Sequence, residues 1–160
     1  MKHTARFICE MAIIAAIYAV LTLILAPISF GPMQVRVSEA LCVLPFFTPA
    51  AVPGLFIGCL IANLFGSTLG ILDIAIGSLA TLLSAFIASK LKQKWLVPLP
   101  SVILNAFLVG LVLHLVLDLP YWINVLYVGI GQGIACYVAG MPLLFILERN
   151  KRRIFKHPAV

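Results

Sequence analysis

Long apolar runs, separated by short polar segments, make up most of the chain. They cover residues 7–27, 39–65, 69–89, 98–117 and 121–147. A helix needs about 20 apolar residues to cross a bilayer, and four of the runs fit one crossing each. The run 39–65 is longer and contains Pro45, Pro49 and Pro53. Because proline removes a backbone donor and clashes with the preceding turn, we expect a break at Thr48 and Pro49.

The basic residues gather in three places. They are Lys2 and Arg6; Lys90, Lys92 and Lys94; and Arg149, Lys151, Arg152, Arg153 and Lys156. Short basic segments stay on the cytoplasmic side, where they also contact lipid headgroups. Placing all three clusters on that side requires an even number of crossings between residues 6 and 90. Division of the run 39–65 into two short helices satisfies this condition.

The pattern therefore predicts an all-α integral membrane protein with six transmembrane helices and both termini in the cytoplasm. We expect residues 1–160 to form a single transmembrane domain. Its helices are expected at about 7–27, 39–50, 51–65, 69–90, 98–117 and 121–147. This topology places the segment Gln34–Glu39 on the outer side.

Composition supports a membrane location and excludes several functions. Of 160 residues, 63% are hydrophobic and 10% are charged, and the mean hydropathy is +1.17. Soluble domains are nearer 45–50% apolar and about 25% charged. The sequence contains no Walker A motif, no dinucleotide-binding fingerprint and no C-x-x-C pair. We therefore expect no catalytic residues, no metal site and no cofactor in this chain, and no nucleic-acid partner.

Ionisable groups inside membrane spans usually face the protein interior or a cavity. Glu39 and Asp73 each lie near the beginning of an expected helix. A carboxylate is stabilised there by the helix dipole alone, with Arg36 as a local partner of Glu39. The alternative is that these carboxylates bind a ligand. The two interpretations are compatible, and the sequence leaves both open.

Two amides also lie inside expected spans. Asn105 and Gln132 each need a hydrogen-bonding partner, which is either a neighbouring helix or a ligand. Gly129, Gly131 and Gly133 surround Gln132. Small residues allow helices to approach closely, and they also leave room for a flat ligand beside the backbone.

Aromatic side chains mark the outer edge of the last span. Tyr121 and Trp122 are typical of the aromatic belt at a membrane surface. Stacking on a planar ligand is the alternative for both.

The first expected helix has a stripe of small residues. Ala12 and Ala16, and Ala15 and Ala19, form two A-x-x-x-A pairs. This spacing makes a smooth surface on which another helix docks closely. Because the chain has no ATPase motif of its own, the stripe indicates a partner subunit.

Four segments resemble the QueT family. They are "QVRVSEALCVLPFFTPAAVPGLFIGCLIANLFG", "GILDIAIGSLATLLSA", "PLPSVILNAFLVGL" and "YVGIGQGIACYVAGMPLLF". The resemblance covers about residues 5–150. It implies the six-helix bundle of the substrate-binding S components of energy-coupling factor (ECF) transporters, which span the plasma membrane of prokaryotes. It also implies that Ala12, Ala16 and Ala19 dock on a transmembrane coupling subunit, while two partner ATPase subunits use ATP.

The QueT family is assigned to uptake of queuosine precursors, which are deazaguanines. Such a ring is planar and presents an edge of donors with one carbonyl acceptor, so carboxylates and amides suit it. The expected substrate-binding residues are Gln34, Arg36, Glu39, Asp73, Asn105, Tyr121, Trp122 and Gln132. The alternatives are an S component for a different vitamin-like ligand and a stand-alone small-molecule transporter. We expect no enzyme activity.

Overall fold

The computed structural model describes residues 2–31 and 33–154. Its elements are α1 (Lys2–Ile24), α2 (Ala26–Ser29), η1 (Val37–Phe46), α3 (Ala51–Gly66), η2 (Asp73–Gly77), α4 (Ser78–Lys90), η3 (Lys94–Leu96), α5 (Leu99–Leu117), α6 (Tyr121–Gly133), η4 (Ile134–Ala139) and α7 (Gly140–Ile154). Elements η1 and η3 are 3-10 helices, and η2 and η4 are π-helical turns that continue directly into α4 and α7. The described part of the chain contains no strand, which confirms the all-α prediction.

The predicted break in the run 39–65 is confirmed. Helix η1 ends at Phe46 and α3 begins at Ala51, with Thr48 and Pro49 between them. Other boundaries differ from the prediction. Helix α1 ends at Ile24 before the separate short turn α2, and the fourth helical segment begins close to Asp73 and not at residue 69. The later start follows from Gly70, which has a left-handed φ of 78° and ends the preceding turn.

Four helical segments of the described chain are long and apolar enough to cross a membrane. They are Thr4–Ile24, Asp73–Lys90, Lys94–Leu117 and Tyr121–Lys151. The other two apolar helices, η1 and α3, are shorter. At about 1.5 Å per residue α3 is roughly 24 Å long, and at about 2 Å per residue η1 is roughly 20 Å long. Both are shorter than the hydrocarbon core of a bilayer, about 30 Å, so six crossings stay a prediction.

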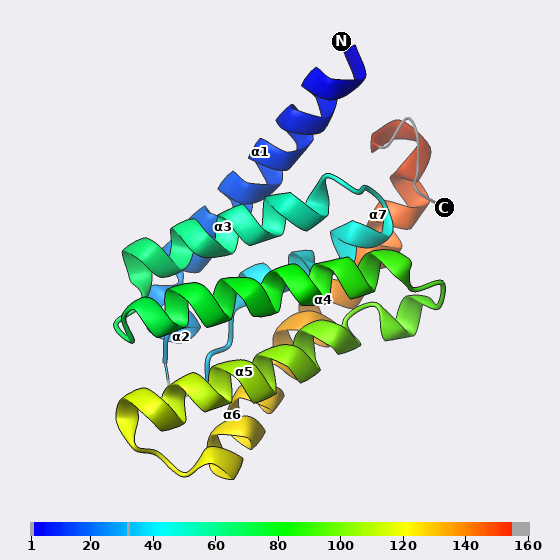
Figure 1. Ribbon diagram of the computed structural model, residues 1–160. Coiled ribbons are helices and arrows are strands. Elements are labelled where there is room, and N and C mark those ends of the chain that lie inside the picture. The colour runs from blue at the N-terminus through cyan, green and yellow to red at the C-terminus, as the bar shows by residue number, and fades with distance from the viewer. Residues whose placement is uncertain (1, 32, 155–160) are drawn as a thin grey trace.

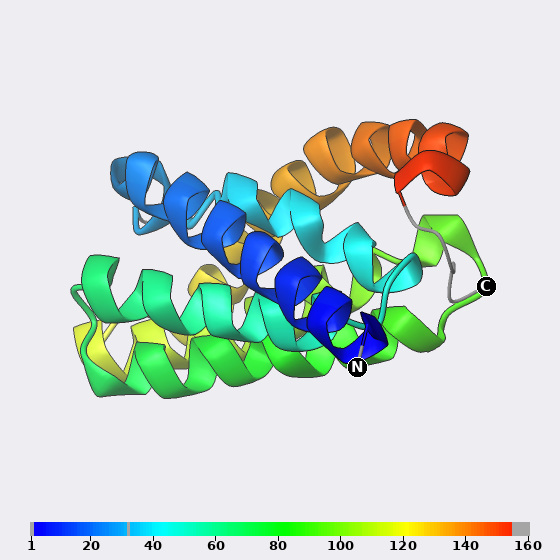
Figure 2. The same cartoon turned by 90° about the horizontal axis from the view of Figure 1, so that it is seen from above.

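The two ends of the helical bundle differ in charge. The beginning of α1, the turn at 90–98 and the end of α7 lie toward one end, and α2 with the α3–α4 and α5–α6 turns lies at the other (Figures 1 and 2). Lys94 Nζ lies 2.6 Å from Glu148 Oε1 and joins the 90–98 turn to α7. The basic segments that the structure describes therefore share one end of the bundle. Their cytoplasmic location stays a prediction.

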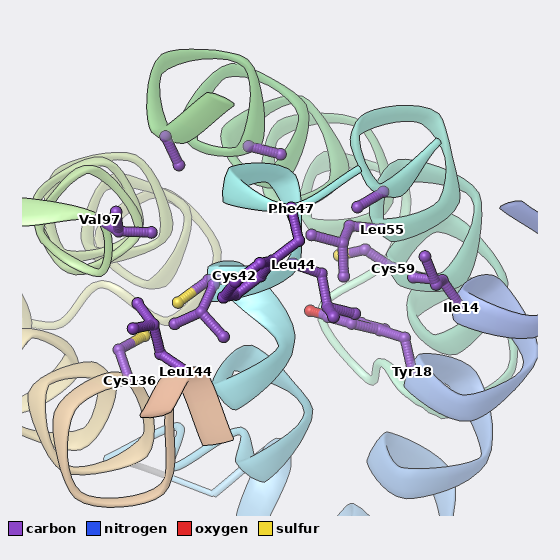
Figure 3. Close-up of a cluster of buried hydrophobic side chains, with 14 of the residues drawn as sticks. Ile14, Tyr18, Cys42, Leu44, Phe47, Leu55, Cys59, Val97, Cys136 and Leu144 are labelled. Atoms are coloured by element: carbon purple, nitrogen blue, oxygen red, sulfur yellow. The ribbon is translucent and has the colours of Figure 1, made fainter. Parts of the chain in front are cut away.

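Helix η1 occupies the centre of the bundle. It packs against α1, α3, α4, η4 and α7. Its apolar side chains Cys42 and Leu44 belong to a core that includes Tyr18 of α1 and Leu144 of α7 (Figure 3). A 3-10 helix of 10 residues is uncommon. Because η1 is surrounded by other helices, its side chains reach several of them at once.

Two glycines of α3 bring α1 close to this centre. A Cβ atom at Gly58 would lie 2.8 Å from the Ala15 carbonyl oxygen and from Tyr18 Cβ. A Cβ atom at Gly54 would lie 2.9 Å from the Met11 carbonyl oxygen. The pair Gly54-x-x-x-Gly58 is therefore a small-residue packing motif. The close approach places Tyr18 beside η1, toward which its side chain reaches (Figure 3).

Candidate functional site

Polar side chains from η1, from the segment before it and from six other elements are buried together. Six of the eight substrate-binding residues expected from the sequence are among them and are at most 2% exposed. We call the following group the polar cluster: Tyr18, Gln34, Arg36, Glu39, Asn63, Asp73, Thr81, Ser101, Asn105 and Gln132. In an apolar bundle, buried polar groups are stable only where they find hydrogen-bonding partners. The partners divide the cluster into two halves. The Glu39 half contains Tyr18, Glu39, Thr81, Ser101 and Asn105. The Asp73 half contains Gln34, Arg36, Asn63, Asp73 and Gln132.

The Glu39 carboxylate is hydrogen-bonded on both oxygens. The Tyr18 hydroxyl donates to Glu39 Oε1 at 2.5 Å, and the Ser101 hydroxyl donates to Oε2 at 2.5 Å. The Thr81 hydroxyl donates more weakly to Oε1 at 3.5 Å. These three donors come from α1, α4 and α5. Glu39 therefore ties η1 to three surrounding helices through charge-assisted hydrogen bonds.

The two intramembrane amides contact other parts of the chain. Asn105 Nδ2 donates to Ser101 Oγ at 3.3 Å, so it supports the hydroxyl that binds Glu39. Gln132 Nε2 donates to the carbonyl oxygen of Gln34 at 3.4 Å. Gln132 thus holds the segment that precedes η1 against α6. The sequence left open whether each amide contacts a neighbouring part of the protein or a ligand. In the structure both amides have a partner within the protein.

The glycines of α6 have different surroundings. A Cβ atom at Gly131 would overlap the Met33 carbonyl oxygen, so only glycine allows residues 33–35 to lie against α6. A Cβ atom at Gly129 would meet Ala106 Cβ at 3.5 Å, and one at Gly133 would meet no atom of the described chain within 4 Å. The space beside Gly131 is therefore filled by the chain's own backbone and not by a ligand.

Arg36 pairs with a distant carboxylate. Arg36 Nη2 lies 3.6 Å from Asp73 Oδ2 and donates to Gln34 Oε1 at 3.3 Å. The guanidinium carbon lies 5.1 Å from the centre of the Phe30 ring, which is cation–π geometry. The sequence predicted a local pair between Arg36 and Glu39, and this is corrected here. The extended backbone of Arg36, with φ −86° and ψ 97°, directs its side chain away from η1.

Asp73 and Asn63 each have one side-chain oxygen that accepts no hydrogen bond from the described residues. The Ser67 hydroxyl donates to Asp73 Oδ2 at 2.5 Å, and Asn63 Nδ2 donates to the Asp73 carbonyl oxygen at 3.2 Å. Asp73 Oδ1 and Asn63 Oδ1 accept no hydrogen bond from the described residues. Both side chains are fully buried. A Cβ atom at Gly77 would lie 3.2 Å from Asp73 Oδ1 and 3.0 Å from Asn63 Nδ2, so both side chains lie close to Gly77.

Other buried polar atoms also lack a hydrogen-bonding partner. In the part of the chain that the structure describes, the buried polar atoms without a partner are Ser29 Oγ, Gln34 Nε2, Arg36 Nε, Asn63 Oδ1, Asp73 Oδ1 and Ser78 Oγ. An unpaired buried polar group costs about 1–3 kcal/mol. Gln34 also has a left-handed φ of 46°, which is unfavourable for a residue with a side chain. Unpaired atoms and backbone strain thus coincide at the Asp73 half, which is typical of a binding site.

A cavity of about 340 Å³ opens at the end of the bundle opposite the basic segments. It is lined by Phe30, Gly31, Thr68, Leu69, Leu113, Leu117, Leu119, Pro120, Ile123, Asn124 and Tyr127. Its volume is within the range of small-molecule pockets. Phe30 borders this cavity and also lies over Arg36. Phe30 therefore contacts both the cavity and the Asp73 half.

The structure does not bring Tyr121 and Trp122 into the polar cluster. The Tyr121 hydroxyl donates to the Phe107 carbonyl oxygen at 3.5 Å, and its ring lies 5.2 Å from the Trp122 ring. Trp122 is 69% exposed. These positions fit the aromatic belt. The aromatic residue beside the cluster is Phe30.

Sequence reasoning missed several members of the cluster. Asn63 is an amide inside an apolar run, so the criterion that selected Asn105 and Gln132 would have found it. Tyr18, Thr81 and Ser101 give no comparable signal. Hydroxyl groups are common in spans, because serine and threonine can bond to their own helix backbone.

The alanine stripe of α1 is divided between two faces. Ala12 and Ala16 are exposed, but Ala19 is only 6% exposed and is buried inside the chain. The predicted docking of Ala19 on a partner is therefore corrected. Exposed apolar neighbours on the same helix include Ile13 and Ile17.

Comparison with known proteins gives one family and one relative. A profile described as "QueT transporter" matches residues 8–149. A protein of Lactococcus lactis subsp. cremoris (strain MG1363), named "Queuosine precursor transporter QueT", is 40% identical over 85 residues. That alignment covers 51% of this chain and 49% of the relative, so the chain spans about half the length of the curated relative it matches. No solved structure matches.

Proposed function

Because the chain belongs to the QueT transporter family, which consists of membrane transporters and not of enzymes, we propose that it captures a queuosine precursor of the deazaguanine type. We propose further that it is the S component of an ECF-type importer, with several crossings of a prokaryotic plasma membrane. The binding site is the Asp73 half of the polar cluster. The Glu39 half holds the surrounding helices in place.

The unpaired atoms of the Asp73 half carry this proposal. Asp73 Oδ1 and Asn63 Oδ1 are free acceptors, and Gln34 Nε2 and Arg36 Nε are free donors, within the described chain. A deazaguanine presents N–H donors and a carbonyl acceptor in one plane. Its N–H donors, on the ring or on an aminomethyl side group, match the two oxygens, and its carbonyl matches the two nitrogens. Each match removes the penalty of an unpaired buried group, so the same atoms that destabilise the empty site favour the bound ligand.

The route to this site is the cavity bordered by Phe30. The cavity lies between the turns opposite the basic end of the bundle. With the basic end in the cytoplasm, it faces outward. Phe30 borders the cavity and its ring contacts Arg36. We propose that a rotation of this ring admits the ligand and allows it to stack on the ring.

Energy for uptake has to come from partner subunits, because the chain contains no ATP-binding motif. We place the coupling subunit against the exposed face of α1 that contains Ala12 and Ala16. Small side chains allow a partner helix to approach closely. Two ATPase subunits that bind the coupling subunit would use ATP, and this chain would bind none.

Calorimetric titration of the purified chain in detergent tests the ligand assignment. The ligands are aminomethyl-deazaguanine, cyano-deazaguanine, queuine, guanine and riboflavin. We expect submicromolar binding of at least one deazaguanine and at least 100-fold weaker binding of guanine and riboflavin. A folded sample that binds riboflavin and no deazaguanine would favour an S component for another vitamin-like ligand. Uptake by cells that lack ECF coupling subunits would favour a stand-alone transporter.

Co-purification with the coupling subunit tests the docking surface. Replacing Ala12 or Ala16 with tryptophan should prevent co-purification without changing ligand affinity, because both residues are exposed and lie outside the polar cluster. The matched control is Ala139→Trp, at an exposed alanine of η4. Equal loss in the control, or full co-purification of both α1 variants, would contradict the assignment.

A further inference from the structure

The buried charges of the polar cluster do not balance. Wherever the structure describes side-chain burial, the buried ionisable side chains with a formal charge are Arg36, Glu39 and Asp73. Arg36 is paired with Asp73 at 3.6 Å. Glu39 accepts hydrogen bonds from three neutral hydroxyl groups, which suits an ionised carboxylate. The cluster therefore contains two carboxylates and one guanidinium, so one negative charge has no counterion.

A negative charge without a counterion is unfavourable inside an apolar bundle. A cation bound in the cluster would neutralise it. The place for that cation is limited by the hydrogen bonds already made. Both Glu39 oxygens are occupied, and Asp73 Oδ2 already contacts Ser67 and Arg36. Asp73 Oδ1 is the carboxylate oxygen that stays available.

From this geometry we infer that the site is selective for a cationic ligand, and that Asp73 Oδ1 is the oxygen that binds its ammonium group. The inference rests on the proposed function and specifies which queuosine precursor the site prefers: the aminomethyl form and not the neutral cyano form. An ammonium group has three donors and no acceptor, and Asp73 Oδ1 is a buried acceptor without a partner in the described chain. Glu39 supplies long-range negative charge without contacting the ligand.

Arg36 does not oppose this assignment. Its guanidinium contacts Asp73 through Oδ2, and its other neighbours include Gln34 Oε1, Cys59 Sγ and the Phe30 ring. The ammonium group is placed at the other oxygen, Oδ1, which lies close to Gly77. The two cations therefore occupy different oxygens of one carboxylate. Asp73 and Glu39 together balance both positive charges.

Two variants test the inference through the ratio of two affinities. In the wild type, we expect aminomethyl-deazaguanine to bind at least tenfold more tightly than cyano-deazaguanine. Asp73→Asn removes the charge at Oδ1 and should lower this ratio at least tenfold. Gly77→Ala keeps every charge but places a methyl group beside Asp73 Oδ1 and Asn63. It should lower the ratio similarly, and it serves as the test where Asp73→Asn does not fold. Gly133→Ala, which meets no atom of the described chain within 4 Å, is the control.

The outcomes separate this inference from the proposed function. Equal or tighter binding of the cyano form by the wild type would overturn the cation inference and leave the deazaguanine assignment intact. An equal loss of both ligands in Asp73→Asn would show that Asp73 reads the ring, which overturns the ammonium subsite. A folded wild type that binds neither deazaguanine would contradict the proposed function and this inference with it.

Discussion

Two buried carboxylates of the polar cluster, Glu39 and Asp73, differ in how their oxygens are hydrogen-bonded. Glu39 accepts short hydrogen bonds from Tyr18 and Ser101, which come from different helices. Asp73 keeps one oxygen without a partner in the described chain, and Asn63 beside it does the same. Both carboxylates are almost completely buried. The difference shows that burial alone does not identify a ligand-binding group: the fully bonded carboxylate organises the fold, and the incompletely bonded one is available to a ligand.

The largest expected effect of a single change is in the Glu39 half. Glu39→Ala leaves the hydroxyl groups of Tyr18 and Ser101 buried without their acceptor. Hydrogen bonds to charged groups contribute about 1.5–3 kcal/mol each, so we expect a loss of about 3 kcal/mol or more in the free energy of unfolding. Thermal unfolding in detergent measures it. An unchanged unfolding midpoint would show that Glu39 does not organise the bundle.

A smaller effect is expected where the segment before η1 lies against α6. A methyl group in Gly131→Ala would overlap the Met33 carbonyl oxygen and displace the segment that contains Gln34 and Arg36. Overpacking of this kind costs about 1–3 kcal/mol, and ligand affinity should fall at least tenfold. Gly133→Ala in the same helix is the matched control and should bind normally. Equal ligand affinities in the two variants would show that the segment with Gln34 and Arg36 is not part of the binding site.

The smallest effect is expected at the aromatic belt. Trp122 is 69% exposed and its ring contacts Tyr121. Substitutions at such positions usually change stability by less than about 0.5 kcal/mol. Trp122→Ala should therefore bind the ligand with wild-type affinity in a titration. A tenfold or greater loss of ligand affinity would show that Tyr121 and Trp122 belong to the binding site.

The sequence was sufficient to predict most of the helical architecture. Prolines at 45, 49 and 53 indicated that the run 39–65 is divided, and the structure has the break at Thr48 and Pro49. The 3-10 conformation of η1 was not predictable. A 3-10 and an α-helix use the same residue types, and here the choice depends on packing against five other elements.

The members of the polar cluster were predictable, but their roles were not. Gln34, Arg36, Glu39 and Asp73 stood out because charged and amide groups are rare in this chain. Their partners come from far along the sequence: Ser101 is 62 residues from Glu39. Whether a carboxylate is fully bonded depends on these distant donors. A one-dimensional pattern therefore locates the polar groups without separating the Glu39 half from the Asp73 half.

The most direct test of this division is thermal unfolding of two variants, with and without aminomethyl-deazaguanine. A ligand that binds only the folded state raises the unfolding midpoint. Glu39→Gln should lower the midpoint of the free protein but keep a ligand-induced increase. Gly77→Ala should keep the midpoint of the free protein near the wild-type value and lose that increase. A wild-type increase in Gly77→Ala, together with loss of the increase in Glu39→Gln, would contradict the account and place the ligand at Glu39.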